Sequence, residues 1–205
     1  MLSRRFSSPQ LISLSLRRQL LRRVERELES NRATDRGVSL PTRDVLVSQL
    51  PKNLVGEVNS VLDAACHWIE RSTGKTVRCG EPFIITYEAG HQVKLARHTD
   101  TESGDDVTLL VALDEPEVDF VGGGTRFYPK HGNTILARPA AGAALAFPST
   151  LEHEGVPITR GKRRLIAAFT KRLKTTVPPQ DVASMRSRQE AAYLNVRFRR
   201  RAGLG

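Results

Sequence analysis

Two hydrophobic patterns divide the chain, a helical spacing in its first half and strand-like runs from residue 82 onwards. Between Pro51 and Gly74 apolar residues recur every three or four positions, the period of a helix with one buried face. They are Leu54, Val58, Val61, Leu62, Ala65, Trp68 and Ile69. A first helical turn tolerates Pro51, and Gly74 supplies a stop. The pattern predicts a helix over 51–71 that packs on a sheet.

After residue 82, short apolar runs alternate with Gly, Pro, Asp and Asn, which is typical of strands joined by turns. The predicted strands are 83–87, 93–98, 107–113, 134–138, 143–147, 158–159 and 165–170, with an earlier strand at 44–47 and a helix over 11–29. Short strands in succession after a long helix predict a mainly β fold with flanking helices, arranged as an antiparallel sandwich or barrel.

The 205 residues suit one domain with extensions. We expect four segments, namely a basic N-terminal segment (1–35), a strand with its supporting helix (36–80), a β-rich core (81–174) and a basic helical tail (175–205). The net charge is +10, and arginine residues gather at both ends. Basic ends can bind nucleic acid or an anionic membrane, but solvated or addressing segments have the same composition.

The residues before Glu25, the first acidic residue, are rich in Arg, Ser and Leu. That composition is typical of a mitochondrial transit peptide. Arg17 and Arg18 interrupt the apolar run, which argues against a secretory signal, and no apolar stretch is long enough to form a transmembrane segment. We expect a mitochondrial location, with a cytoplasmic protein carrying a basic N-terminal helix as the alternative.

The two cysteines, Cys66 and Cys79, have neither the CxxC spacing nor that of a zinc site. Cys66 falls within the helical apolar pattern, so we expect its thiol to be buried. The chain has the composition of an intracellular protein, in which two cysteines do not imply a disulfide.

The candidate chemistry lies in His98-Thr99-Asp100 and His153. Residues two positions apart point to the same face of a strand, so His98 and Asp100 are expected to lie together. Two histidines and one carboxylate with open positions opposite them form the facial triad of non-haem Fe(II) oxygenases. The HxD pattern alone often arises by chance. The other histidines, His67, His91 and His131, are expected to be structural or loop residues, with a substrate-facing role open for His91.

Four motifs in order make the pattern specific. They are His98-x-Asp100, Gly123-Gly124-Thr125-x-Phe127, Pro139-x-x-Gly142-x-Ala144-x-x-Phe147, and His153-x-Gly155-x-Pro157-Ile158-x-x-Gly161-x-Arg163. Together they resemble the prolyl 4-hydroxylase-type Fe(II)/2-oxoglutarate-dependent dioxygenase family, over roughly Tyr87 to Lys171. The resemblance implies a double-stranded β-helix, or jelly-roll, core.

The resemblance also implies roles for individual residues. His98, Asp100 and His153 would bind Fe(II), and Arg163, ten positions after His153, would pair with the distal carboxylate of 2-oxoglutarate and complete the catalytic set. The family more often has lysine at that position, so Lys162 is the alternative in a shifted register. The planar fork of arginine favours Arg163. Three further polar residues are candidates for a role at the site. Tyr87 matches a tyrosine that hydrogen-bonds the cosubstrate but lies farther from His98 than the family spacing, and Thr108 and Thr159 are candidate supporting polar groups.

The implied activity is hydroxylation of a protein or peptide side chain with Fe(II), O2, 2-oxoglutarate and L-ascorbate, releasing succinate and CO2. Two alternatives stay open, a nucleic-acid oxidative demethylase of the same fold and a non-catalytic jelly-roll module that binds RNA or ribosomes through its basic ends. The segment after His153 lacks the paired arginines of the demethylases, and the complete residue set argues against a non-catalytic module. Acidic residues in 101–106 and 114–119 could attract basic substrates or simply be solvated. The sequence does not indicate an oligomeric state.

Overall fold

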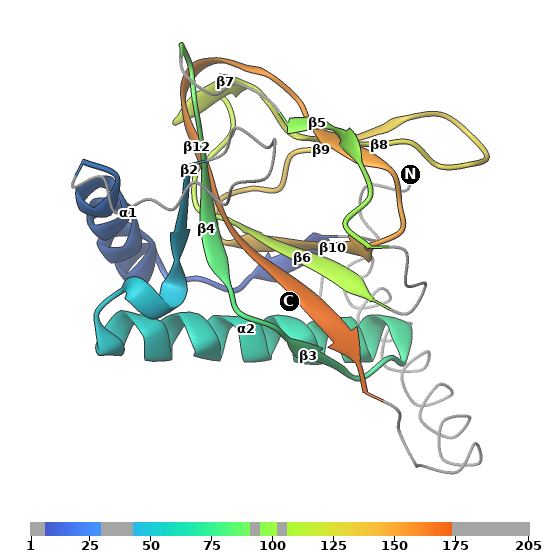
Figure 1. Cartoon of the computed structure of the whole chain (residues 1–205), viewed down its shortest axis with the longest axis horizontal. Coiled ribbons are helices and arrows are strands. Elements are labelled where there is room, and N and C mark those ends of the chain that lie inside the picture. Colours follow the sequence, from blue (N-terminus) through green and yellow to red (C-terminus); the bar gives the residue numbers. More distant parts are fainter. Residues whose placement is uncertain (1–6, 30–42, 91–94, 102–105, 174–205) are drawn as a thin grey trace, which may run out of the picture. The chain divides into compact units, whose positions relative to one another are not determined.

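The computed structural model of the chain describes residues 7–29, 43–90, 95–101 and 106–173 (Figure 1). These residues belong to one compact unit, Met1–Leu173, and a second unit begins at Lys174. The predicted C-terminal helix, His91 and most of the acidic segment 101–106 therefore lie outside the described residues.

The described chain consists of antiparallel strands and two α-helices, which confirms the prediction of a mainly β fold with flanking helices. The elements are β1 (Ser7–Gln10), α1 (Leu14–Glu29), β2 (Arg43–Leu46), the 3-10 helix η1 (Val47–Gln49), α2 (Lys52–Thr73), β3 (Val77–Cys79), β4 (Phe83–Glu88), β5 (Leu95–His98), β6 (Val107–Ala112), β7 (Phe120–Gly122), β8 (Thr125–Phe127), β9 (Ile135–Ala137), β10 (Ala143–Pro148), β11 (His153–Gly155) and β12 (Ile158–Arg172).

The strands form two sheets. The larger sheet has the order β1-β10-β6-β12-β4-β2, with β3 and β7 also paired to β12, and the smaller sheet has the order β5-β11-β8-β9. One apolar cluster contains inward side chains of both sheets, such as Leu110, Phe127 and Leu165, so the sheets face each other across it. The other face of the larger sheet is covered by the helices, with α2 beneath it in Figure 1. This is the jelly-roll core that the sequence predicted.

The central strands of the larger sheet carry apolar residues on both faces where both faces are buried. In β6, Leu109 and Val111 pack with the helices, whereas Leu110 faces the smaller sheet. In β12, Ile166 packs with the helices and Leu165 faces the smaller sheet. Strand alternation therefore sorts neighbouring residues into the helix layer or the interior between the sheets.

Helix α2 matches the prediction closely. Its buried residues are Leu54, Val58, Val61, Leu62, Ala65 and Ile69. Pro51 lies one residue before the helix as its N-cap, and Gly74 ends it with a left-handed backbone (φ 69°), donating its N–H to the carbonyl of Glu70. Glycine adopts this conformation without the steric cost that a Cβ brings.

Helix α1 begins at Leu14 rather than at Leu11, and the Ser13 hydroxyl accepts a hydrogen bond from the N–H of Leu16. Its inward residues recur every four positions and are buried together with the preceding Ile12; they are Leu16, Leu20, Val24 and Leu28. The same segment that has the composition of a transit peptide thus contributes to the core. None of the helices in the described part is long and apolar enough to cross a membrane.

The two strands predicted at 158–159 and 165–170 are one continuous strand, β12, of 15 residues. At Gly161 φ is 78°, and a Cβ would collide with the carbonyl oxygen of Asp119. Up to Gly161 β12 pairs with β7, and after it β12 pairs with β4 and β6. Strands β1, β3, β7, β8 and β11, of three or four residues each, were not predicted.

The packing of α1 leads to a stability prediction. Leu20 is fully buried, so Leu20→Ala should lower the free energy of unfolding by about 2–5 kcal/mol, measured by urea denaturation. Leu14 on the same helix is 51% exposed, and Leu14→Ala should change it by less than about 0.5 kcal/mol. Equal effects of the two substitutions would contradict the packing of α1 in the core.

Candidate metal centre

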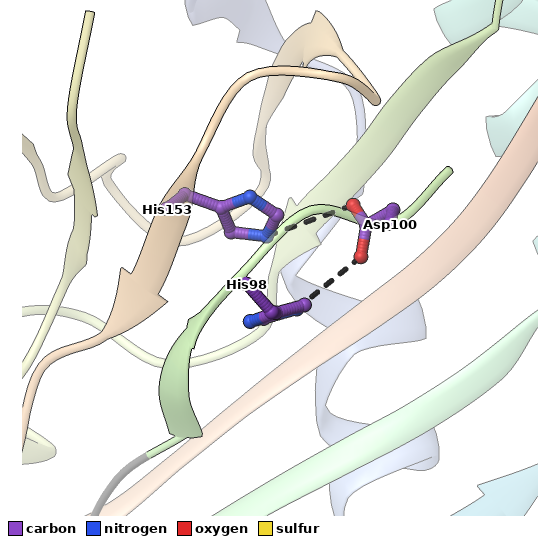
Figure 2. Close-up of side chains that lie close together, drawn as sticks. All are labelled: His98, Asp100 and His153. Carbon is purple, nitrogen blue, oxygen red and sulfur yellow. Dashed lines mark ion pairs between the residues drawn. The ribbon is translucent and has the colours of Figure 1, made fainter. Parts of the chain in front are cut away.

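Three side chains that are distant in sequence meet at one edge of the smaller sheet (Figure 2). His98 ends β5 and lies directly opposite His153 in the antiparallel pair β5–β11. Asp100 follows β5 by two residues and points to the same side as His98, as the HxD spacing predicts. One ligand atom from each of the three side chains lies within 4.8 Å of the others. The structure thus brings together all three predicted metal ligands.

Both imidazoles present Nε2 to the shared carboxylate. Nε2 of His98 lies 3.3 Å from Oδ1 of Asp100, and Nε2 of His153 lies 3.6 Å from Oδ2. Nδ1 of His98 lies 2.7 Å from the carbonyl oxygen of Ala96, and Nδ1 of His153 lies 2.9 Å from that of Leu151. A carbonyl only accepts, so Nδ1 carries the proton in each neutral ring and the Nε2 lone pair is free. This is the tautomer that a metal-binding histidine needs, and the donor set fits Fe(II).

One hydroxyl group donates to the carboxylate of Asp100, and a second hydroxyl group contacts the first. The Thr108 hydroxyl donates to Oδ2 of Asp100 at 2.5 Å and lies 2.9 Å from the Ser149 hydroxyl. The N–H of Asp100 also donates to the carbonyl of Ser149. Both hydroxyl-bearing residues are buried. Thr108 was a predicted supporting group, whereas Ser149 was not identified because no sequence signal links it to Asp100.

The local electrostatics favour the metal-binding forms of Asp100 and His153, whereas they favour the protonated form of His98. Burial alone would raise the pKa of Asp100, but the hydrogen bond from His98 and the charge of His153 outweigh it, so the pKa lies below its usual value. Burial lowers the pKa of His153 and favours its neutral form. The hydrogen bond to Asp100 raises the pKa of His98. A bound cation favours neutral imidazoles and an ionised carboxylate further.

Aromatic rings cover the inner side of His153. Its ring centroid lies 4.7 Å from that of Phe147 and 6.1 Å from that of Phe127. An apolar pocket of ≈ 280 Å³ adjoins these two rings and is also lined by Leu151 and by His131, the predicted loop histidine. The site therefore has an apolar wall on one side of a polar ligand set. His67 lies on the exposed surface of α2, away from this site.

Arg163 is buried in the interior between the sheets. Its guanidinium donates to the carbonyl of Gly124 at 3.2 Å and to the Thr125 hydroxyl at 3.0 Å, and lies 5.3 Å from the centre of the Tyr87 ring. No carboxylate of the described residues lies within ion-pair distance of it. Burial lowers the pKa of Arg163, which reflects the cost of keeping this charge away from water. An anionic ligand would relieve that cost.

The neighbouring Lys162 points to the opposite face of β12. Its ammonium pairs with Glu25 of α1 and lies 3.3 Å from Glu88. Arg164 also points that way and pairs with Asp114 at 2.8 Å. Arg163 shares its inward face with Leu165 and Ala167, as predicted. Of the two cationic candidates, Arg163 is the one that faces the interior.

Strand β8 contacts both parts of the site, the buried Arg163 and the metal-binding His153. Thr125 contacts Arg163, and Phe127 lies opposite His153 in the pair β8–β11. Two residues span about 7 Å along a strand, so the two contact points are separated by roughly the length of a small dicarboxylate. Tyr87 is buried on the same interior face, whereas the hydroxyl of Thr159 donates to the carbonyl of Val121 on the exposed side.

The acidic stretch 114–119 is engaged in internal contacts. Asp114 pairs with Arg164, Glu117 pairs with Arg138 and Asp119 pairs with Arg17 of α1. The side chain of Glu115 accepts a hydrogen bond from the N–H of Ala141. These carboxylates hold the loop before β7 in place, which leaves little of their charge for a substrate.

The sequence of the region that contains this site is similar to those of known proteins. Residues 83–171 match the family model of the 2OG-Fe(II) oxygenase superfamily, inside the predicted core segment 81–174. The rat multifunctional procollagen lysine hydroxylase and glycosyltransferase LH3 (Rattus norvegicus) is 37% identical over 89 residues, which are 42% of this chain and 11% of that protein. The chain thus spans about a tenth of the length of the curated relatives it matches.

Solved structures share the fold. A prolyl-4-hydroxylase from Pseudomonas putida has a TM-score of 0.64 at 19% identity, covering 82% of this chain and 92% of that one. A prolyl hydroxylase from Trichoplax adhaerens, solved with a peptide of hypoxia inducible factor, has a TM-score of 0.64 at 18% identity, with coverages of 80% and 82%. At these identities the likeness concerns the fold. Residues 83–171 are thus similar in sequence to the 2OG-Fe(II) oxygenase superfamily, and the described chain shares the fold of solved prolyl hydroxylases.

Proposed function

We propose that this chain is an Fe(II)- and 2-oxoglutarate-dependent dioxygenase that hydroxylates a side chain of a protein or peptide. One observation carries the proposal. The same interior contains the triad His98, Asp100 and His153 and the buried Arg163, which has no ion pair with a carboxylate of the described residues. The site could hold a metal at one end and a carboxylate at the other. When bound, iron with 2-oxoglutarate and O2 supplies the oxidising power, and 2-oxoglutarate is converted to succinate and CO2.

The residues of the chain contribute binding and orientation. His98, Asp100 and His153 would hold Fe(II), while Thr108 and Ser149 fix the direction of the Asp100 carboxylate. Arg163 would bind the distal carboxylate of 2-oxoglutarate, with the Thr125 hydroxyl orienting its fork and the Tyr87 ring covering it. The apolar inner walls exclude water, which strengthens these charge interactions. Ascorbate, as a reductant that keeps the iron ferrous, belongs to the same proposal.

The substrate side chain has two candidates, lysyl and prolyl. The 37% identity to a procollagen lysine hydroxylase over 89 residues favours a lysyl side chain. The sequence motifs resemble those of prolyl 4-hydroxylases, and solved prolyl hydroxylases share the fold. A fold hosts many reactions, so the substrate has to be decided by experiment.

The function is tested by incubating the purified chain with Fe(II), 2-oxoglutarate, ascorbate and either lysyl or prolyl collagen-like peptides. We expect succinate release coupled to a mass gain of one oxygen on one peptide class. His153→Ala should abolish both signals because it removes a metal ligand, whereas His67→Ala on the α2 surface should leave them unchanged. Substantial turnover by His153→Ala would refute the metal site, and hydroxylation of a nucleic acid instead would favour the demethylase alternative.

A second prediction separates the two candidate cations. Arg163→Ala should raise the 2-oxoglutarate concentration for half-maximal succinate release roughly thirtyfold or more, since it removes a buried charge partner. Iron binding should persist. Lys162→Ala breaks contacts to Glu25 and Glu88 on the opposite face and should change this concentration less than about threefold. A larger effect at Lys162 than at Arg163 would show that the other register holds the cosubstrate.

The hydrogen bond from Thr108 to Asp100 gives a third prediction. Thr108→Val removes the hydroxyl at nearly constant volume and should weaken Fe(II) binding by about 10–100-fold, as measured by anaerobic equilibrium titration. Thr108→Ser keeps the hydroxyl and should bind within a few-fold of the original chain. If valine and serine bind equally well, the hydrogen bond to Asp100 does not orient the ligand.

A mitochondrial location is a proposal that rests on the composition of the first residues. The packing of β1 and α1 adds a condition to it. Because Leu16, Leu20 and Val24 belong to the core, import with the fold preserved requires that processing spares α1. A fluorescent fusion of residues 1–30 that stays in the cytosol would count against this location.

A further inference from the structure

The two cysteines of the chain lie close together on α2 and β3, elements that carry none of the proposed metal ligands. Cys66 lies on α2 and Cys79 ends β3, and their sulfur atoms are 3.0 Å apart. Both thiols are free and half-buried, whereas the sequence predicted a buried thiol at Cys66. Neither side chain contacts a residue of the proposed catalytic machinery in the described structure. The pair therefore needs an explanation of its own.

Each cysteine is held by its own anchored element. The neighbours of Cys66 on α2, Ala65 and Ile69, are buried in the core. Cys79 lies opposite Thr170 in the pair β3–β12, and the next N–H, that of Gly80, donates to the carbonyl of Phe169. A disulfide has a sulfur–sulfur distance of about 2.05 Å, so the two sulfurs need to approach by only about 1 Å. Packing thus delivers the thiols nearly to bonding distance.

The environment distinguishes the roles of the two sulfurs. The hydrogen bond between the two thiols lowers the pKa of Cys66 against the opposing effect of burial, while the same contact and burial raise the pKa of Cys79. The exposed His67 beside Cys66 lowers the pKa of Cys66 further, and Asp63 opposes this. A thiolate is the attacking species in thiol–disulfide exchange, so Cys66 is suited to attack and Cys79 to resolve.

We propose that Cys66 and Cys79 form a reversible dithiol–disulfide site that is oxidised by a low-molecular-weight disulfide such as glutathione disulfide. The Cys66 thiolate attacks one sulfur of the oxidant, forms a mixed disulfide and releases one thiolate. The Cys79 thiol then loses its proton, its sulfur bonds to Sγ of Cys66, and the mixed disulfide breaks to release the second thiol. In total, two electrons and two protons pass from the cysteine pair to the oxidant, which becomes two thiols.

The bond would join the helix layer to the larger sheet. It closes the segment between positions 66 and 79 and ties α2 to β3, which is paired with the C-terminal half of β12. Arg163 lies in the other half of β12, opposite Tyr87. Oxidation should therefore stabilise the fold by restricting the unfolded chain while leaving the metal centre unchanged. The site sets stability rather than turnover.

The test equilibrates the full chain in glutathione buffers from fully reduced to fully oxidised. Because the sequence has only two cysteines, a thiol count and the intact mass report on this pair alone. We expect both thiols to disappear together with a loss of two hydrogens, a 66–79 crosslinked peptide, and a rise in Tm of about 5 °C or more that dithiothreitol reverses. Metal affinity should be the same in both states.

Two single variants serve as controls. Cys66→Ser and Cys79→Ser should each lose the redox dependence of Tm, and Cys79→Ser should retain a glutathione adduct on Cys66 because the resolving thiol is missing. Retention of two free thiols by the original chain in oxidised buffer, a lasting glutathione adduct on it, or a crosslink between two copies would each overturn the proposal. An unchanged Tm on formation of the 66–79 bond would overturn its stabilising role.

Discussion

The pairing of β5 with β11 is the contact on which the site depends. It sets His98 directly opposite His153, two ligands that are separated by 55 positions in the chain but adjacent in the sheet. Because β11 also pairs with β8, the same register brings Phe127 against His153 and Thr125 toward Arg163. A shift of one residue would turn the His153 side chain to the other face of the sheet. The proposed metal ligands and the proposed cosubstrate contacts therefore share one register.

The buried charge of Arg163 is the second constraint on this interior. Isolated cations are expensive to keep in an apolar environment, and the only hydrogen-bond acceptors that the described structure gives this guanidinium are neutral oxygens. The flanking Lys162 and Arg164 point the opposite way and find carboxylates on α1, β4 and the loop after β6. Three consecutive basic residues are thereby divided by strand alternation into one unpaired interior charge and two paired exterior charges.

Sequence reasoning recovered the parts of the fold and site that have a local signal. Helix α2, the long apolar strands and the spacing of His98 and Asp100 follow from periodicity, and Arg163 follows from its distance to His153 within a known motif. The short strands β7, β8 and β11 have no such signal, because tertiary pairing and not composition defines them. Ser149 could not be found for the same reason: it is 49 positions from Asp100 and meets it only after β10 pairs with β6. The proximity of Cys66 and Cys79 likewise required the placement of β3 against α2.

Helix α1 combines the composition of a transit peptide with packing in the core, which limits when its apolar side is accessible. Its inward residues form an apolar stripe flanked by arginines, and that stripe is occupied by the larger sheet once the domain is folded. Any receptor or membrane surface that recognises the stripe competes with the sheet for the same side chains. Any recognition of this stripe would therefore be confined to the unfolded or nascent chain, because the completed fold buries it.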